Sequence, residues 1–388
     1  MKFGLWFNTM VPKPLDADDW EPGQEVRRFA ETVEQIETAD RLGYDYAFVG
    51  EHHFLADYAH FSASDMVLAA AARTTSNIRL GTAITQMSHN DPVRVAERMA
   101  TLDVLSGGRV EFGSGEGGAA EIAPLMDDPS VKKARRMEAE TEVLRILASR
   151  DLYPGWQGEH FRLPAVNVVP KSVQRPHPPV WLAGARRDQT VEAAQRGMGS
   201  QVLSLLGPDD IRDRVDIYWE TFRREGRPIG AAANPAVAAF ASTHVAATDE
   251  EAHRRSREGF AFFGYGLMKA GSGQLVGKPN LHLWRDFVSG VPVGPESTVD
   301  LPDPTRAPGS LVGSVDTVRA AVRALEETNV DVCMCTVQTG NTRHDHILES
   351  LELFAREIMP DVRERADVHA RWRASQLDGI DIAVNSTV

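Results

Sequence analysis

Apolar residues recur along this chain in two patterns that alternate, and the alternation predicts the fold. Short apolar runs bounded by glycine, proline or polar residues are typical of buried strands. Each run is followed by a longer segment in which apolar residues return every three to four positions, as on the buried face of a helix. Residues 44–50, for example, are predicted to form a strand, and residues 24–42 a helix that ends at Gly43.

Eight strands are predicted in this way, at residues 2–8, 44–50, 77–85, 109–113, 179–183, 201–205, 236–246 and 331–338. Helices are predicted at residues 24–42, 62–74, 92–105, 131–149, 189–196, 209–225, 249–269, 314–328 and 344–359. Strict alternation of strand and helix implies parallel strands, and eight such units suit a closed barrel better than an open sheet. We therefore predict an α/β fold, a TIM (β/α)8 barrel with an insertion before the last βα unit. An open doubly wound sheet is the structural alternative.

The same pattern predicts the domain organisation. Residues 1–373 are expected to form a single barrel domain, and residues 374–388 a loosely held C-terminal tail. Residues 271–310 interrupt the alternation, because they are rich in glycine and proline and carry few periodic apolar positions. A long segment of this kind inside a compact domain is usually a lid or a disordered loop, so we expect a lid-like insertion.

Composition narrows the class of protein. Hydrophobic residues make up 42% and charged residues 25%, as in ordinary globular proteins. The net charge of −13 argues against a nucleic-acid partner. No membrane span or signal peptide is expected from the hydropathy of the sequence, so a cytoplasmic protein is expected. The two cysteines, Cys333 and Cys335, lie on one face of a predicted strand and are expected to be core residues.

The strongest candidate for chemistry is the run Glu51, His52, His53 and Phe54, which directly follows the second predicted strand. In α/β barrels the carboxyl ends of the strands carry the active site. One imidazole there can act as a general base while its neighbour points to the opposite face; the alternative is that both rings have a structural role. A metal site needs further ligands, and no nearby spacing supplies an obvious set, so no metal is expected.

Three further turns are candidates for binding a ligand. Small residues at 79–85 permit the close approach of a flat ring, although tight core packing would explain them equally well. The glycine-rich turn at 113–118 exposes backbone N–H groups but is not a Walker loop. Arg186 and Arg187 lie beside a predicted helix N-terminus, where they form either a phosphate cradle or a solvated surface pair.

Taken in order, these motifs resemble the bacterial luciferase-like flavin monooxygenase family over nearly the whole chain. The matching segments are residues 1–4, 42–45, 51–54, 80–83, 91–97, 102–109 and 192–197. The resemblance implies a TIM barrel with a mobile lid and a two-component, FMN-dependent monooxygenase. Such an enzyme takes reduced FMN from a separate flavin reductase, uses O2 as co-substrate and oxygenates its substrate through a C4a-peroxyflavin. It also implies a homodimer formed through the second and third helices.

The resemblance also assigns residues. His52 matches the catalytic histidine, with Glu51 beside it, and the Ala83–Ile84 bond matches a non-proline cis peptide that supports the flavin ring. Gly184 and Ala185 match the phosphate-binding turn, and the turn after the fourth strand is expected to contact the cofactor at Gly115.

Two departures from the family pattern change these expectations. Gly115 and Glu116 stand where luciferases carry a reactive cysteine and an arginine, and Ala185 replaces a serine of the phosphate turn. We therefore expect Arg186 or Arg187 to hold the phosphate.

Aromatic and polar residues at strand ends and in the insertion suggest a small, apolar organic substrate. The predicted substrate residues are Asn8, His53, Phe54 and Trp284. A deazaflavin-dependent hydride-transfer enzyme of the same superfamily is one alternative function, although its members more often carry Asp-His at this strand tip. A non-enzymatic flavin-binding protein is the other alternative, and the histidine pair and the predicted lid argue against it.

Overall fold

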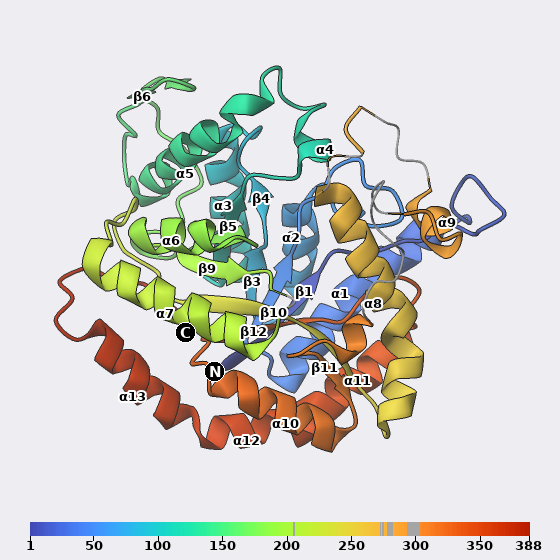
Figure 1. Ribbon diagram of the computed structural model, residues 1–388. Helices are drawn as coiled ribbons and strands as arrows, with labels where there is room; N and C mark the ends of the chain where they lie inside the picture. Colours follow the sequence, from blue (N-terminus) through green and yellow to red (C-terminus); the bar gives the residue numbers. More distant parts are fainter. Residues whose placement is uncertain (205, 272, 274, 278–281, 293–302) are drawn as a thin grey trace.

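The structure is a computed structural model that describes residues 1–388 except 205, 272, 274, 278–281 and 293–302. Its centre is a closed barrel of parallel strands (Figure 1). In order around the barrel the strands are β1 (Lys2–Phe7), β2 (Tyr46–Val49), β3 (Arg79–Thr82), β5 (Val110–Gly115), β8 (Val180–Gly184), β9 (Gly199–Val202), β10 (Val237–Val245) and β12 (Val332–Thr336). Pairing of β12 with β1 closes the ring, with Phe3 opposite Cys333. The predicted TIM barrel is thus confirmed.

Helices surround the barrel and cover its outer face. They are α1 (Gln24–Leu42), α2 (Ser64–Thr74), α3 (Pro92–Ser106), α5 (Lys132–Ala148), α6 (Arg187–Gln195), α7 (Pro208–Glu225), α8 (Asp249–Gly271), α10 (Val315–Glu326) and α11 (His344–Glu357). Their ends follow local chemistry: the Asp91 side chain accepts hydrogen bonds from the first turn of α3, and Gly107 ends that helix at φ 70°. No described helix is long and apolar enough to cross a membrane.

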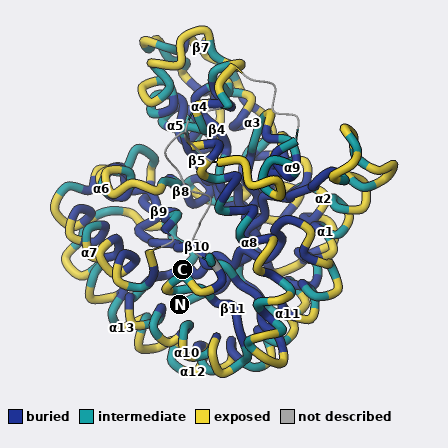
Figure 2. Tube along the Cα trace, turned by 45° about the vertical axis from the view of Figure 1, so that its right-hand side comes forward, coloured by how far each residue is buried: buried dark blue, intermediate teal, exposed yellow. Residues whose placement is uncertain are grey.

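The two largest apolar cores hold the barrel together, and Figure 2 shows the buried segments gathered around its centre. One core lies between the strands and the helices and includes Leu5, Ala47 and Cys333. The other fills the barrel interior with large side chains, so the barrel is not a pore; it includes Trp6, Tyr46, Phe48, Trp181, Phe240 and Met334. This inner core continues beyond the carboxyl ends of the strands into an aromatic group on α8 and α9 (Leu283–Val288).

Several short elements lie outside the predicted pattern. After β3, the chain forms β4 (Thr85–Gln86), which pairs with the end of β5, and after β5 it forms α4 (Ala119–Ile122). The predicted long loop at 151–178 contains a small hairpin, β6 (Trp156–Gln157) and β7 (Arg162–Leu163). An edge strand, β11 (Leu311–Gly313), pairs in parallel with the end of β10. Within the predicted insertion the structure describes α9 and the short helix η2 (Pro304–Arg306), and most of the remainder lies outside the described residues.

The expectation of a loosely held C-terminal tail is wrong. After α12 (Met359–Glu364), helix α13 (Ala366–Leu377) continues past the predicted boundary, and the last residues return to the amino end of the barrel. Val384 forms a bridge to Ala233, and the Thr387 hydroxyl lies 2.6 Å from Oε1 of the buried Glu111. These contacts, together with the packing of Ile380 and Ile382 against the outer core, hold a segment that the periodic hydrophobic pattern did not identify.

Candidate active site

The loop after β2 is fixed to its neighbours by backbone hydrogen bonds. The Glu51 amide donates to the Ile84 carbonyl (3.0 Å), and the His52 amide donates to the Phe61 carbonyl (2.8 Å). Because these bonds tie the loop to the end of β3 and to the segment before α2, the side chains of residues 51–53 leave the barrel in fixed directions.

The ring of His52 lines a cavity of about 590 Å³ at the carboxyl end of the barrel. Most of the wall is apolar and includes Trp20, Phe54, Leu55, Ala59, Ala120 and Leu275. At another part of the wall, Nδ1 of His60 lies 3.2 Å from a carboxylate oxygen of Glu25. A cavity of this size, with apolar walls and few polar groups, suits a small organic ligand.

His52 is paired with a residue that the sequence analysis did not identify. Its Nδ1 lies 3.0 Å from Oε1 of Glu121, a buried carboxylate on α4. The same oxygen accepts hydrogen bonds from the His53 amide (3.0 Å) and from the side-chain amide of Gln86 (2.7 Å). Glu121 therefore fixes the orientation of the imidazole and leaves Nε2 as its free ring nitrogen.

The electrostatics of this pair favour its charged form. Burial alone would lower the pKa of His52, but the charge of Glu121 and the hydrogen bond to it raise the pKa above its ordinary value. Burial alone would raise the pKa of Glu121, but the charge of His52 and the hydrogen bonds that Glu121 accepts lower it. Both shifts stabilise an imidazolium beside a carboxylate, so His52 is poised to donate a proton or a hydrogen bond.

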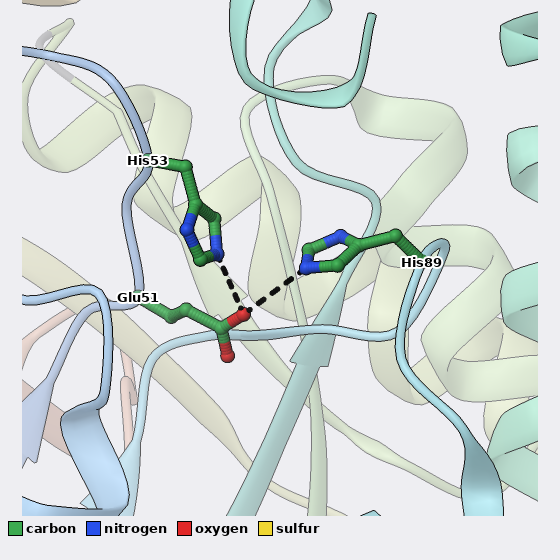
Figure 3. Close-up of side chains that lie close together, drawn as sticks. All are labelled: Glu51, His53 and His89. Carbon is green, nitrogen blue, oxygen red and sulfur yellow. Dashed lines mark hydrogen bonds and ion pairs between the residues drawn. The ribbon is translucent and has the colours of Figure 1, made fainter. Parts of the chain in front are cut away.

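Glu51 and His53 belong to a second group, which adjoins the His52–Glu121 pair through Gln86. Oε1 of Glu51 lies 3.0 Å from Nε2 of His53 and 3.6 Å from Nε2 of His89 (Figure 3). Asn90 Nδ2 donates to the same oxygen at 3.2 Å. The two neighbouring histidines thus point to different sides: His52 lines the cavity, and His53 contacts Glu51.

The peptide bond between Ala83 and Ile84 is cis, as the resemblance predicts. The Ala83 carbonyl accepts a hydrogen bond from the indole of Trp6 (3.0 Å). Ile84 packs against the backbone of Gly115, where an added Cβ would lie 2.4 Å from the Ile84 side chain. Two of the predicted cofactor-binding segments are therefore in direct contact, and Gly115 is glycine because Ile84 fills the space beside it.

The predicted phosphate turn lies at the end of β8 and the start of α6, but its two arginines point to different partners. Arg186 pairs with Asp188 in the same turn (2.9 Å), and Arg187 reaches Asp213 on α7 (2.9 Å). Their side chains are 59% and 56% exposed. The structure does not bring the two guanidinium groups together, and Arg187 is engaged away from Gly184 and Ala185.

Among the predicted substrate residues, Phe54 lines the cavity. Asn8 is buried, and its Nδ2 donates to the Tyr58 carbonyl (2.9 Å). Trp284 on α9 packs edge-on against Phe262. His53 is turned to Glu51, so Asn8, His53 and Trp284 do not belong to the described wall of the cavity that His52 lines.

Sequence reasoning also missed Gln86, His89 and Gln201. Gln201 on β9 is buried inside the barrel beside Gly113, and neither end of its amide has a hydrogen-bond partner among the described residues. Such an amide inside a barrel indicates a group that meets a polar ligand or water. No motif marks these residues, because their importance comes from the side-by-side placement of strand ends.

A closed βα barrel with a histidine–carboxylate pair and a cavity at the carboxyl ends of its strands has the architecture of an enzyme. The model of the luciferase-like monooxygenase family matches residues 1–332, so the chain belongs to this family. The resemblance inferred from the motifs is thereby confirmed.

Among curated relatives, the chain is 26% identical over 249 residues to the oxygenase component of a flavin-dependent trigonelline monooxygenase from Acinetobacter baylyi. That match covers 61% of this chain and 65% of the relative. Limonene 1,2-monooxygenase from Rhodococcus erythropolis is 27% identical, with 63% of this chain and 62% of the relative covered. The chain thus spans less than two thirds of the length of these relatives.

Solved structures show the same fold. A monooxygenase from Streptomyces bottropensis superimposes with a TM-score of 0.73 at 24% identity, covering 93% of this chain and 100% of that one. The oxygenating constituent of 3,6-diketocamphane monooxygenase from Pseudomonas putida, in complex with FMN, gives 0.70 at 18% identity, covering 93% and 98%. An F420-dependent secondary alcohol dehydrogenase also gives 0.70 at 17% identity, covering 93% and 99%.

Proposed function

We propose that this protein is the oxygenase of a two-component, FMN-dependent monooxygenase that uses reduced FMN and O2 to oxygenate a small, apolar organic substrate. The observation that carries the proposal is the position of His52, whose ring lines the apolar cavity while Glu121 holds its Nδ1 at 3.0 Å. Family membership supports the same reaction class.

The residues present fit a flavin. The unpartnered amide of Gln201 offers a donor and an acceptor inside the barrel, and the buried Asn8 Oδ1 offers a further acceptor. Ile84 touches Gly115 where the flat ring is expected to lie. We propose Ala83, Ile84, Gly115, Gly184 and Ala185 as cofactor contacts. Of the two arginines, Arg186 is the better candidate for the phosphate, because its partner Asp188 is itself exposed.

When bound, reduced FMN would supply the reaction with O2 through a C4a-peroxyflavin. The protein's task is to exclude water, hold the substrate and place a proton donor. His52 fits the last role, because its raised pKa keeps a proton on the imidazole and Glu121 fixes the direction of Nε2. Glu51 supports this loop through its contacts to His53 and Gln86 rather than by reaching the cavity.

A separate flavin reductase is proposed as the partner, and the printed name of the trigonelline relative, an oxygenase component, supports it. Deazaflavin-dependent hydride transfer is the alternative, and two solved structures of F420-dependent enzymes have the same fold as this chain. The buried His52–Glu121 pair favours the oxygenase, because a protonated imidazole beside a carboxylate suits oxygen chemistry that needs a hydrogen-bond donor.

One experiment separates these functions. The purified protein is mixed anaerobically with photoreduced FMN and then with oxygenated buffer, while the flavin spectrum is followed. A transient peroxyflavin spectrum that outlives the one seen with free FMN is the expected result. Reoxidation at the rate of free flavin, together with tight binding of reduced deazaflavin, would assign the hydride-transfer reaction instead. Tight binding of either flavin without any change in its reactivity would indicate a flavin-binding protein.

A homodimer through α2 and α3 is proposed as the assembled state. Met66 on α2 is 74% exposed, and a groove of about 420 Å³ runs between these helices, lined in part by Ala69, Leu102 and Leu105. The groove also carries charged residues, among them Asp65, Arg94 and Glu97, so an exposed methionine and apolar floor residues with charged neighbours are available to pack against a second copy. Light scattering should give the dimer mass, and Met66→Glu should shift it toward the monomer; a monomeric wild-type protein would contradict the proposal.

A further inference from the structure

We propose that Glu51, His53 and His89 form a binding site for a divalent first-row transition-metal ion such as Zn²⁺. The three side chains come from the loop after β2 and the loop before α3, and they converge as Figure 3 shows. One potential ligand atom from each lies within 4.8 Å of the other two. The sequence alone does not indicate this group of ligands, because His89 is far from Glu51 along the chain.

The spacing fits one shared ion. Two ligands that are each about 2.1 Å from a tetrahedral Zn²⁺ lie roughly 3.4 Å from each other. Nε2 of His53 and Nε2 of His89 lie 3.0 Å and 3.6 Å from the same Glu51 oxygen, values on either side of that separation. The two rings are nearly perpendicular, at 84°, with their centroids 5.0 Å apart. An ion would therefore need only small side-chain movements.

The site is sheltered and partly preorganised. The side chains of Glu51, His53 and His89 are 8%, 16% and 12% exposed. The second carboxylate oxygen of Glu51 accepts a hydrogen bond from the Gln86 amide (3.3 Å). Asn90, which contacts the first oxygen, is itself held by Arg98 (2.9 Å). Outer partners of this kind orient metal ligands.

The ligand chemistry selects the class of ion. Two imidazoles and one carboxylate suit Zn²⁺, Fe²⁺ or Co²⁺, whereas Mg²⁺ and Ca²⁺ prefer oxygen ligands alone. Three protein ligands leave a position open for water, as in catalytic rather than structural zinc sites.

One feature limits the affinity. Nδ1 of His89 is buried without a hydrogen-bond partner among the described residues. When Nε2 binds the ion, the neutral ring carries its proton on Nδ1, and this N–H group then has no acceptor. The absence of such an outer partner typically weakens a site by 10- to 100-fold. We therefore expect reversible binding that a chelator removes, not an ion that survives purification in EDTA.

The proposed ion would join two loops beside the candidate active site. The His53 amide donates to Glu121, the partner of His52, so the site lies one residue away from the proposed proton donor. The proposal does not depend on FMN or on the oxygenase reaction, because the three ligands contact neither the described cavity nor the predicted phosphate turn.

The test uses the full-length protein after EDTA treatment and dialysis, without flavin. Co²⁺ is added in increments, its visible d–d absorption is recorded, and Zn²⁺ is then used to displace it. We expect one Co²⁺ per chain, with the intensity of a four- or five-coordinate site. His53→Ala and His89→Ala should each abolish the spectrum. His60→Ala, which removes another histidine that faces a glutamate, should leave the spectrum unchanged.

Thermal unfolding in EDTA first establishes which variants fold. If His53→Ala does not fold, the metal site is tested with His89→Ala and His89→Gln, because the His89 side chain has fewer contacts than that of His53. The proposal is overturned if Co²⁺ gives only the weak octahedral spectrum of the free ion, or if binding persists in the His89 variants. It is also overturned if His60→Ala loses the spectrum to the same degree, since binding would then not be specific to this group.

Discussion

Nδ1 of His52 lies 3.0 Å from Oε1 of Glu121, although 69 residues separate the two in the chain. His52 follows β2 directly, whereas Glu121 lies on α4, beyond the glycine-rich turn that ends β5. Gln86 connects the two positions, because its side-chain amide donates to the Glu51 carbonyl (2.9 Å) and to Glu121 (2.7 Å). The proton donor proposed for catalysis is therefore oriented by Gln86 on β4 and Glu121 on α4, two short elements that follow the barrel strands β3 and β5.

Glu121→Gln should test this orientation. The amide keeps the size of the side chain but removes the charge that raises the pKa of His52. Activity that needs protonated His52 should fall by roughly 10- to 100-fold. As the pH rises, the remaining activity should be lost at a lower pH than in the wild type, because the pKa of His52 is lower in the variant. Both profiles are measured in EDTA, and unchanged pH profiles would contradict the positioning role.

His52→Ala should separate binding from chemistry. The side chain lines the cavity, and its partner Glu121 keeps the hydrogen bonds from the His53 amide and from Gln86 when the ring is removed, so the variant should fold and bind FMN. Product formation should fall by about 10²- to 10⁴-fold, the usual contribution of a positioned proton-transfer group. His60→Ala, in the wall of the same cavity, serves as the matched control and should retain most of its turnover. Full activity in His52→Ala would refute the assignment.

The two arginines of the predicted phosphate turn should behave differently. Arg186→Ala should weaken FMN binding by about 10-fold and riboflavin binding much less, since a charge-assisted hydrogen bond contributes about 1.5–3 kcal/mol before solvent screening. Arg187→Ala should change both affinities little, because its guanidinium is engaged by Asp213 on α7. Fluorescence titration with each flavin measures the effect. Equal losses for FMN and riboflavin in Arg186→Ala would argue against a phosphate contact.

The fold was predictable because its signals are local and repeated. Buried parallel strands such as β2 are nearly continuous apolar runs, and helices such as α3 carry their own caps in Asp91 and Gly107. With eight such units in succession, a closed barrel follows from general rules of α/β architecture.

The details of the site were less predictable, because they depend on which loops meet in space. His52 was identified because it follows a strand, whereas Glu121 lies on a helix too short to show a periodic pattern and His89 lies in the loop before α3. Gln201 lies within a predicted strand, but the sequence does not show that its amide lacks a partner. The C-terminal segment was misjudged for a related reason: its contacts, both the hydrogen bonds of Thr387 and the packing of Ile380 and Ile382, are with residues far away in the chain.

Removing residues 384–388 should destabilise the barrel. Thr387 contacts Tyr46 and Glu111 at the amino end of the barrel, and the Asn385 amide donates to Ala233. With about 1 kcal/mol for each hydrogen bond, the free energy of unfolding should fall by roughly 2–4 kcal/mol. Urea unfolding measures the loss, and Thr387→Val should show only about 1 kcal/mol of it. A truncated protein with an unchanged midpoint would mean that these contacts do not stabilise the barrel.

His244 should make the protein less stable in mild acid. It is buried on β10, and burial, together with Arg255 on α8 and His346 on α11, lowers its pKa to about 4, although Glu349 opposes the shift. The folded state therefore keeps His244 neutral, whereas the unfolded state takes up a proton near pH 6.5. The unfolded state binds more protons between these values, so this contribution is complete above about pH 6.5 and is lost as the pH falls toward 4.

The size of the effect follows from the two pKa values. Between pH 7 and pH 5, His244 alone should remove about 2 kcal/mol from the free energy of unfolding. His244→Asn cannot take up this proton, so its stability should fall less over the same interval, whatever its stability at pH 7. Urea unfolding of both proteins at the two pH values measures the difference, in which the contributions of the other histidines cancel. Equal losses in the two proteins would show that His244 is not protonated on unfolding in this range.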